Sequence, residues 1–213
     1  MDYMPDDNSR YKDVDYWDER YKTEQCYDWL GGFSKFQHLL EEHVKKEDSI
    51  LILGCGNSSM SGDMYSAGYH SITNIDYSSV CISTMTARYS DCPGMTWHQM
   101  DVRQLCFPAA SFDVILEKAT LDAIMVEEKS PWDVSPQTAC FVHQALTEVR
   151  RVLQGQVHFA FVPAHTPCRN TCVSRHVLSS GCNQLSTESR SESMAEACDL
   201  PTLQSHSGHT EDS

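Results

Sequence analysis

The chain has 213 residues, of which 40% are hydrophobic, enough for one domain with a sizeable core or a slightly smaller domain with a tail. Its formal net charge of −14 at pH 7 argues against a nucleic-acid partner, because phosphate contacts need a surplus of Lys and Arg, and it suits a basic protein substrate. The sequence holds no stretch near the ~18 apolar residues that a membrane helix needs and no signal-peptide pattern, so we expect a cytoplasmic protein without a membrane partner.

The predicted elements alternate between helix and strand along the chain. Tyr11, Val14, Trp17 and Tyr21 fall at helical spacing, as do apolar residues in several later segments. Amphipathic helices are therefore predicted over 10–21, 33–44, 62–67, 78–89, 121–126 and 136–153. Short apolar runs predict buried strands over 49–53, 71–75, 95–100, 111–116 and 156–162. This alternation indicates an α/β fold with a Rossmann-like, doubly wound and mostly parallel sheet.

Composition divides the chain into three parts. Residues 1–9 are polar and acidic and are predicted to form a flexible N-terminus. Residues 10–162 hold the predicted elements and form the candidate domain. Residues 163–213 contain no Phe, Tyr or Trp, so this tail cannot bury enough apolar surface to offset its conformational entropy, and we predict that it is disordered. The 10 cysteines form no compact framework, and most are expected to be free thiols.

The strand over 49–53 leads into a glycine turn, Gly54-Cys55-Gly56, where a ligand can approach the backbone because glycine lacks a Cβ. Asp76 ends the next strand about twenty residues later, the distance at which a doubly wound sheet presents a carboxylate to ribose hydroxyls. Asp101 and Glu117 end two further strands. A lone strand-end acid is more often a turn or helix cap. Acids that recur at one sheet edge indicate a nucleoside site.

Four motifs follow one another at a characteristic spacing: Gly54-Cys55-Gly56, Asp76-Tyr77, Asp101-Val102 and residues 112–118. Together they resemble the seven-strand S-adenosylmethionine-dependent methyltransferases. Further segments are similar to the branch of that family that methylates lysines of translation elongation factor 1 alpha, namely residues 16–21, 27–29 and 116–123. The likeness covers most of the candidate domain and stops near residue 155.

The resemblance implies S-adenosylmethionine as the cofactor. Backbone N–H groups of the glycine turn suit its carboxylate, Asp76 its ribose hydroxyls and Asp101 its adenine amine. Tyr77 offers a flat face to adenine, and Lys118 is implied to contact the cofactor through its main chain. Aromatic side chains of the N-terminal segment are implied to close over it. The predicted cofactor-binding residues are Trp17, Tyr21, Trp29, Gly54, Gly56, Asp76, Tyr77, Asp101, Val102 and Lys118.

The same resemblance implies a protein-lysine N-methyltransferase whose protein substrate is translation elongation factor 1 alpha, and we expect it to act as a monomer. A substrate lysine must first lose its proton, which is costly at neutral pH because its free pKa is ~10.4. Glu117 and Asp122 follow the fourth strand, next to the expected methyl group, and are the acids to test for this role. No catalytic residue is assigned. Cys55 is interpreted as a small buried filler.

Two alternatives remain at this point. The family carries Pro-Gly-Gly before the fifth strand and a hairpin after it, whereas this chain has Gln154-Gly155-Gln156 and no candidate hairpin. The chain could thus be a catalytically silent, cofactor-binding interaction protein. A dehydrogenase-like domain binding NAD is disfavoured because the glycine turn lacks the third glycine of dinucleotide folds. No metal site is predicted, since no standard zinc spacing joins the candidate ligands in the tail, which are Cys168, Cys172, Cys182, His165 and His176.

Overall fold

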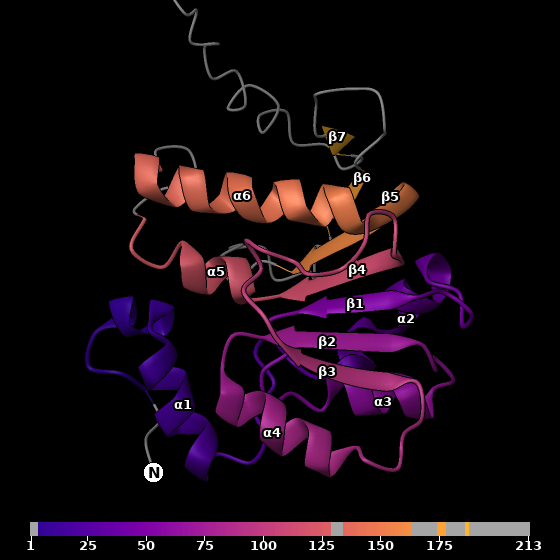
Figure 1. Cartoon of the computed structure of the whole chain (residues 1–213), viewed down its shortest axis with the longest axis horizontal. Coiled ribbons are helices and arrows are strands. Elements are labelled where there is room, and N and C mark those ends of the chain that lie inside the picture. Colours follow the sequence, from indigo (N-terminus) through magenta and orange to yellow (C-terminus); the bar gives the residue numbers. More distant parts are fainter. Residues whose placement is uncertain (1–3, 129–133, 163–173, 178–185, 188–213) are drawn as a thin grey trace, which may run out of the picture.

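The computed structural model, shown in Figure 1, describes residues 4–128, 134–162, 174–177 and 186–187. Its strands are β1 (Ile50–Leu53), β2 (Ile72–Asp76), β3 (Met95–Gln99), β4 (Phe112–Lys118), β5 (Leu153–Val162), β6 (Ser174–Val177) and β7 (Ser186–Thr187). Its helices are the 3-10 helix η1 (Asn8–Lys12), α1 (Val14–Thr23), α2 (Phe33–His43), α3 (Met60–Ser66), α4 (Ser79–Arg88), α5 (Thr120–Ile124) and α6 (Pro136–Val152). The described strands join in one sheet with the order β3-β2-β1-β4-β5-β6-β7.

The order of the strands confirms the predicted doubly wound fold. Strands β1 to β5 pair in parallel, and β1 lies between β2 and β4, with Ile50 opposite both Ile72 and Val114. The chain leaves β1 toward β2 and β3 on one side and later fills β4 and β5 on the other. In such a sheet, ligands bind beyond the carboxyl ends of the strands at the point where the order reverses. That point here is the end of β1.

Helices cover both faces of the sheet. Ile50 and Ile52 of β1 belong to a core cluster with α2, α3 and α4, whereas Leu51 and Leu53 belong to a second cluster with α6. The split follows from the two-residue period of a strand, which sends successive side chains to opposite faces. Because both faces are buried, β1 has no polar residue at all, as is typical of central parallel strands.

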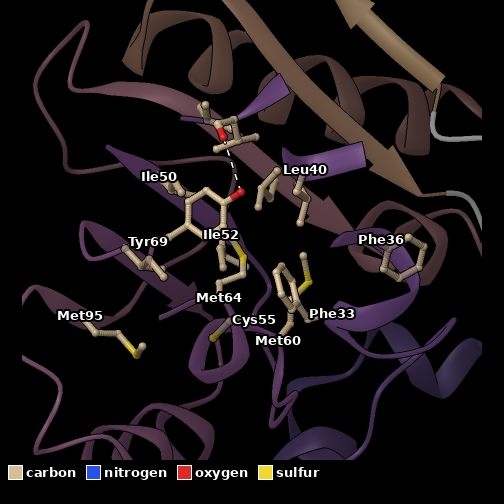
Figure 2. Close-up of a cluster of buried hydrophobic side chains, with 14 of the residues drawn as sticks. Phe33, Phe36, Leu40, Ile50, Ile52, Cys55, Met60, Met64, Tyr69 and Met95 are labelled. Atoms are coloured by element: carbon tan, nitrogen blue, oxygen red, sulfur yellow. Dashed lines mark hydrogen bonds between the residues drawn. The ribbon is translucent and has the colours of Figure 1, made fainter. Parts of the chain in front are cut away.

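The cluster behind β1 fixes the position of the glycine turn. Figure 2 shows Phe36 and Leu40 of α2 and Met60 of α3 in this cluster, with Cys55 of the glycine turn among them. Cys55 is buried, and burial raises the pKa of its thiol well above the usual value, so it is a neutral side chain packed in the core. The turn is therefore held against close-packed side chains. This burial agrees with the interpretation of Cys55 as a small filler.

The N-terminal helix differs from its prediction over 10–21. Asp13 has an extended conformation, with φ −89° and ψ 124°, and separates η1 from α1. Its N–H donates to the carbonyl of Arg10, which closes η1 before α1 begins at Val14. Tyr11 and Trp17 are buried as expected, but Val14 is 38% exposed. A helical period alone does not reveal a one-residue break, because the apolar positions on either side keep their spacing.

The C-terminal part of the sheet also differs from the prediction that no hairpin follows β5. The short strands β6 and β7 are antiparallel, β6 pairing with β5 and β7 with β6. Strands this short lack an apolar alternation, and only pairing with a distant segment defines them. The rest of the tail, including Cys168, Cys172 and Cys182, lies outside the described residues, as do residues 1–3. No helix in the described part of the chain is long and apolar enough to cross a membrane.

Candidate active site

A cavity of about 690 Å³ opens at the carboxyl ends of β1, β2 and β4. This volume lies in the range of about 300–1,000 Å³ that is usual for small-molecule sites. Figure 1 shows α1 and α5 at the end of the sheet to which the arrows of these strands point. Every predicted cofactor-binding residue lines this cavity, as do the two candidate acids Glu117 and Asp122. The structure thus brings together residues that the sequence places in six separate segments.

The glycine turn leaves no space for side chains. Gly54 and Gly56 have φ values of 55° and 54°, in the left-handed region that favours glycine. A Cβ on Gly54 would lie 2.1 Å from Oγ1 of Thr120, and one on Gly56 would lie 3.0 Å from the hydroxyl oxygen of Tyr21. The turn also uses some of its own donors, because the Cys55 N–H donates to Ile75 and the Gly56 N–H to Asp76. Those two N–H groups are not open to a ligand in this arrangement.

Asp76 is a buried acid at the end of β2. Its Oδ2 accepts from the Gly56 N–H at 3.0 Å and its Oδ1 from the Ser78 N–H at 2.9 Å. Burial raises the pKa of Asp76 to about 6, although these hydrogen bonds favour its charged form. At neutral pH the carboxylate is therefore ionised and is held by backbone donors. It can accept hydrogen bonds from the two hydroxyls of a ribose.

Asp101 meets a partner that the sequence did not indicate. Arg103 donates to both carboxylate oxygens, with Nε to Oδ1 at 3.0 Å and Nη2 to Oδ2 at 2.6 Å. These hydrogen bonds lower the pKa of Asp101. The same guanidinium lies 4.2 Å from the ring centroid of Phe141 on α6. Asp101 therefore lies at the cavity as predicted, with Arg103 in the place foreseen for the adenine amine.

The N-terminal segment covers the cavity with aromatic rings. Trp17 stacks on Tyr21 with 5.6 Å between ring centroids, and its Nε1 donates to the carbonyl of Tyr11 at 2.8 Å. Trp29 meets Trp17 edge to face at 6.3 Å. All of these side chains line the cavity. Ser78, which caps α4, donates to Asp18 of α1 at 2.5 Å and so fastens this helix next to Asp76.

Beneath these rings lies a buried ion pair that the sequence reasoning missed. Arg20 Nε and Glu24 Oε2 are 2.8 Å apart, and the guanidinium lies within 5.5 Å of the ring centroids of Trp17, Tyr27 and Trp29. A cation among aromatic faces is attracted by their negative electrostatic potential. The available signal was the i,i+4 spacing of opposite charges at the end of the predicted helix, with Glu24 three residues beyond its last residue. This pair stabilises the aromatic cover rather than facing the cavity.

Lys118 fastens the loop between α1 and α2. Its Nζ contacts Asp28 Oδ1 at 3.2 Å and the carbonyls of Trp29 and Gly31 at 3.0 and 3.3 Å. Burial lowers the pKa of Lys118, while Asp28 opposes this shift. Asp28 also accepts hydrogen bonds from Ser58 and Ser59, directly after the glycine turn. The side chain of Lys118 thus ties three segments together, a role that the sequence did not indicate.

Glu117 and Asp122 stand at the junction of β4 and α5. Glu117 is only 2% exposed, and its Oε1 accepts from the N–H groups of Thr120 at 2.5 Å and Leu121 at 2.9 Å. Burial raises the pKa of Glu117 to about 8, and the charge of Asp122 adds to this shift. At neutral pH Glu117 is therefore mostly protonated in the empty cavity, and a cationic ligand beside it would favour its carboxylate form.

Tyr77 and Val102 complete the predicted set. Both line the cavity, Tyr77 after β2 and Val102 after Asp101. Burial raises the pKa of Tyr77, with the charge of Asp76 contributing, so its hydroxyl stays protonated at neutral pH. The backbone of this residue is held by Gln99, whose Nε2 donates to the Tyr77 carbonyl at 3.2 Å. An aromatic ring and a backbone N–H at this edge suit a planar base.

Comparison of the sequence with known protein families agrees with the fold and the position of the cavity. A family model described as a methyltransferase domain matches residues 50–156, which span β1 to the start of β5. The chain belongs to the methyltransferase-domain family. The matched range of this methyltransferase domain includes the glycine turn and the three strand-end acids but not the N-terminal aromatic cover.

Curated relatives match a longer part of the chain than the family model does. EEF1A lysine methyltransferase 4 of Bos taurus is 44% identical over 167 residues, covering 77% of this chain and 66% of the relative. The Mus musculus protein of the same name is 46% identical over 153 residues, covering 70% and 60%. The chain thus spans less than two thirds of the length of these relatives.

A solved structure supports the fold of the methyltransferase domain. Phosphoethanolamine N-methyltransferase 1 of Haemonchus contortus, in complex with phosphoethanolamine and S-adenosylhomocysteine, superimposes with a TM-score of 0.50 at 12% identity. The match covers 77% of this chain and 35% of that one. At this identity the likeness concerns the fold alone.

Proposed function

We propose that this chain is an S-adenosylmethionine-dependent protein-lysine N-methyltransferase that acts on translation elongation factor 1 alpha. The substrate class follows the printed names of the Bos taurus and Mus musculus relatives. The observation that carries the proposal is the cavity at the end of β1, whose wall contains every residue expected to bind the cofactor.

The residues present fit such a cofactor. Gly54 and Gly56 keep the turn free of side chains where a ligand would pass, and a Cβ at either position would collide with or crowd a neighbour. Asp76 offers a buried carboxylate to ribose, and Tyr77 and Val102 offer a ring face and a backbone N–H to adenine. Trp17, Tyr21 and Trp29 would exclude water from the bound molecule.

When bound, S-adenosylmethionine supplies a methyl group on a positively charged sulfur. The protein's part is to align a lysine amine with that methyl group and to exclude water, because positioning and desolvation lower the barrier of such a displacement. The amine must be neutral, and burial beside a cation lowers the pKa of a lysine. Asp122 and Glu117 line the same cavity and are the candidate acceptors for the lysine proton.

Two measurements on the full chain test the proposal. Calorimetry should detect binding of S-adenosylhomocysteine and none of NAD, and a tritiated-methyl assay should label a lysine of purified elongation factor 1 alpha. Binding without transfer to the elongation factor would favour a silent, cofactor-binding interaction protein. Binding of NAD instead would contradict the methyltransferase assignment of the cavity.

A further inference from the structure

Glu117 is an acid of the cavity wall whose two carboxyl oxygens have different surroundings among the described residues. Glu117 uses Oε1 for two backbone N–H groups, while its Oε2 is buried and has no hydrogen-bond partner in the described part of the chain. The other strand-end acids are satisfied: both oxygens of Asp76 accept backbone N–H groups, and both oxygens of Asp101 accept from Arg103. A buried carboxylate oxygen without a donor is costly, so a ligand that donates to it binds with an advantage.

Glu117 lies next to the glycine turn. Leu53, the residue before the turn, pairs with Glu117 across β1 and β4. Thr120, whose N–H donates to Glu117, also donates from its hydroxyl to the Leu53 carbonyl at 3.1 Å and lies against Gly54. Glu117 therefore belongs to the part of the cavity wall that adjoins Gly54.

Three basic side chains on the cavity wall pair with acids other than Glu117. Lys12 pairs with Glu127, Arg103 with Asp101, and Lys118 with Asp28. Asp122 adds a second carboxyl group whose charge acts on Glu117. The ligand expected here is therefore a cation with N–H donors, small enough to lie beside a backbone turn.

We propose that the Glu117 carboxylate, through Oε2, receives the α-ammonium group of the cofactor's amino-acid end. This inference rests on the proposed function, because it assumes an adenosyl cofactor whose amino acid lies over the glycine turn. The ammonium is the one part of that molecule that both carries N–H donors and is positively charged. With Glu117 engaged in this way, Asp122 is the remaining cavity acid near the expected methyl group for the substrate lysine.

The test compares two ligands that differ in the amino-acid end. S-adenosylhomocysteine carries the ammonium, whereas 5′-methylthioadenosine has the same nucleoside and sulfur without it. Calorimetry on the full chain should show that Glu117→Gln lowers the affinity for S-adenosylhomocysteine at least about tenfold. The affinity for 5′-methylthioadenosine should change less than about twofold, because a charged hydrogen bond is lost only for the first ligand. The amide oxygen of Gln can still accept from Thr120 and Leu121.

Asp101→Asn is the matched control, because it lies at the adenine end and should weaken both ligands alike. Equal effects of Glu117→Gln on both ligands, or unchanged affinity for S-adenosylhomocysteine, would overturn the inference while leaving the proposed function intact. If the wild-type chain binds neither ligand, the proposed function itself fails. Glu117→Asp, which keeps the charge but shortens the side chain, replaces the Gln variant if that variant does not fold, with the same selective loss expected.

Discussion

Gly54 is the residue on which the turn depends most directly. Its φ of 55° is strained for any residue with a Cβ, and that Cβ would overlap Thr120 Oγ1 at 2.1 Å. We expect Gly54→Ala to lower the free energy of unfolding by at least about 2 kcal/mol and to abolish binding of S-adenosylhomocysteine. Urea denaturation and calorimetry measure the two effects.

A double-mutant cycle separates the clash from the backbone strain. In a Thr120→Ala background the overlapping hydroxyl and methyl groups are gone. Gly54→Ala should therefore lower the free energy of unfolding less in that background than in the wild type. Equal costs in both backgrounds would mean that the contact with Thr120 is unimportant.

The burial of Asp76 predicts a pH-dependent stability. Its folded pKa of about 6 lies above the usual 3.8, so the folded state holds the proton more tightly than the unfolded state does. Wild-type stability should therefore fall relative to Asp76→Asn as the pH rises from 4 to 7, by up to about 3 kcal/mol. Urea denaturation at several pH values measures this difference.

Asp101 provides a control of opposite sign. Arg103 lowers the pKa of Asp101, so the charged form stabilises the folded state and this contribution disappears as the pH falls through the folded pKa. Wild-type stability relative to Asp101→Asn should thus increase with pH. If both variants followed the same trend, the assigned electrostatic environments would be wrong.

At the scale of elements, the loop between α1 and α2 is held by one side chain from β4. Lys118 donates to Asp28, Trp29 and Gly31, and these hydrogen bonds are mostly shielded from water. We expect Lys118→Met to lower the free energy of unfolding by about 1–3 kcal/mol. Amide hydrogen exchange should increase in residues 25–32 and stay the same in β1 and β2. Exchange measured by mass spectrometry localises the effect.

Lys35→Met is the matched control for this loop. Lys35 is exposed, and its side chain donates one hydrogen bond to the loop, from Nζ to the Leu30 carbonyl at 2.7 Å. Lys35→Met should lower the free energy of unfolding by less than about 0.5 kcal/mol and leave amide hydrogen exchange in the loop nearly unchanged. Comparable effects of the two substitutions would contradict an anchoring role that is specific to Lys118.

At the scale of the whole molecule, the net charge of −14 bears on how a protein substrate arrives. If the substrate presents its lysine on a basic surface, opposite charges speed the encounter, and salt screens them. We expect kcat/KM for the elongation factor to fall about tenfold between low salt and 0.2 M NaCl, with kcat and the affinity for S-adenosylhomocysteine nearly constant. A kcat/KM that does not change with salt would exclude electrostatic steering.

Much of the fold could be predicted because its signals are local. The apolar run of β1, the glycines that follow it and the acid at the end of β2 each reflect a requirement of nearby backbone: burial on both faces, a left-handed turn and a strand end. Their order along the chain then indicated a doubly wound sheet. The break at Asp13 and the pairing of β6 with β5 could not be predicted in this way, because neither changes the local apolar pattern.

The sequence by itself thus determined the class of fold, the edge of the sheet that holds the cavity and part of the set of residues on its wall. Only the tertiary structure decided what each polar group meets there: Arg103 on Asp101, the loop carbonyls on Lys118, and no partner for Oε2 of Glu117 among the described residues. The physical reason is that residue type and spacing fix backbone conformation and burial over short ranges. The partner of a polar side chain depends on which distant segments the folded chain brings within hydrogen-bonding distance.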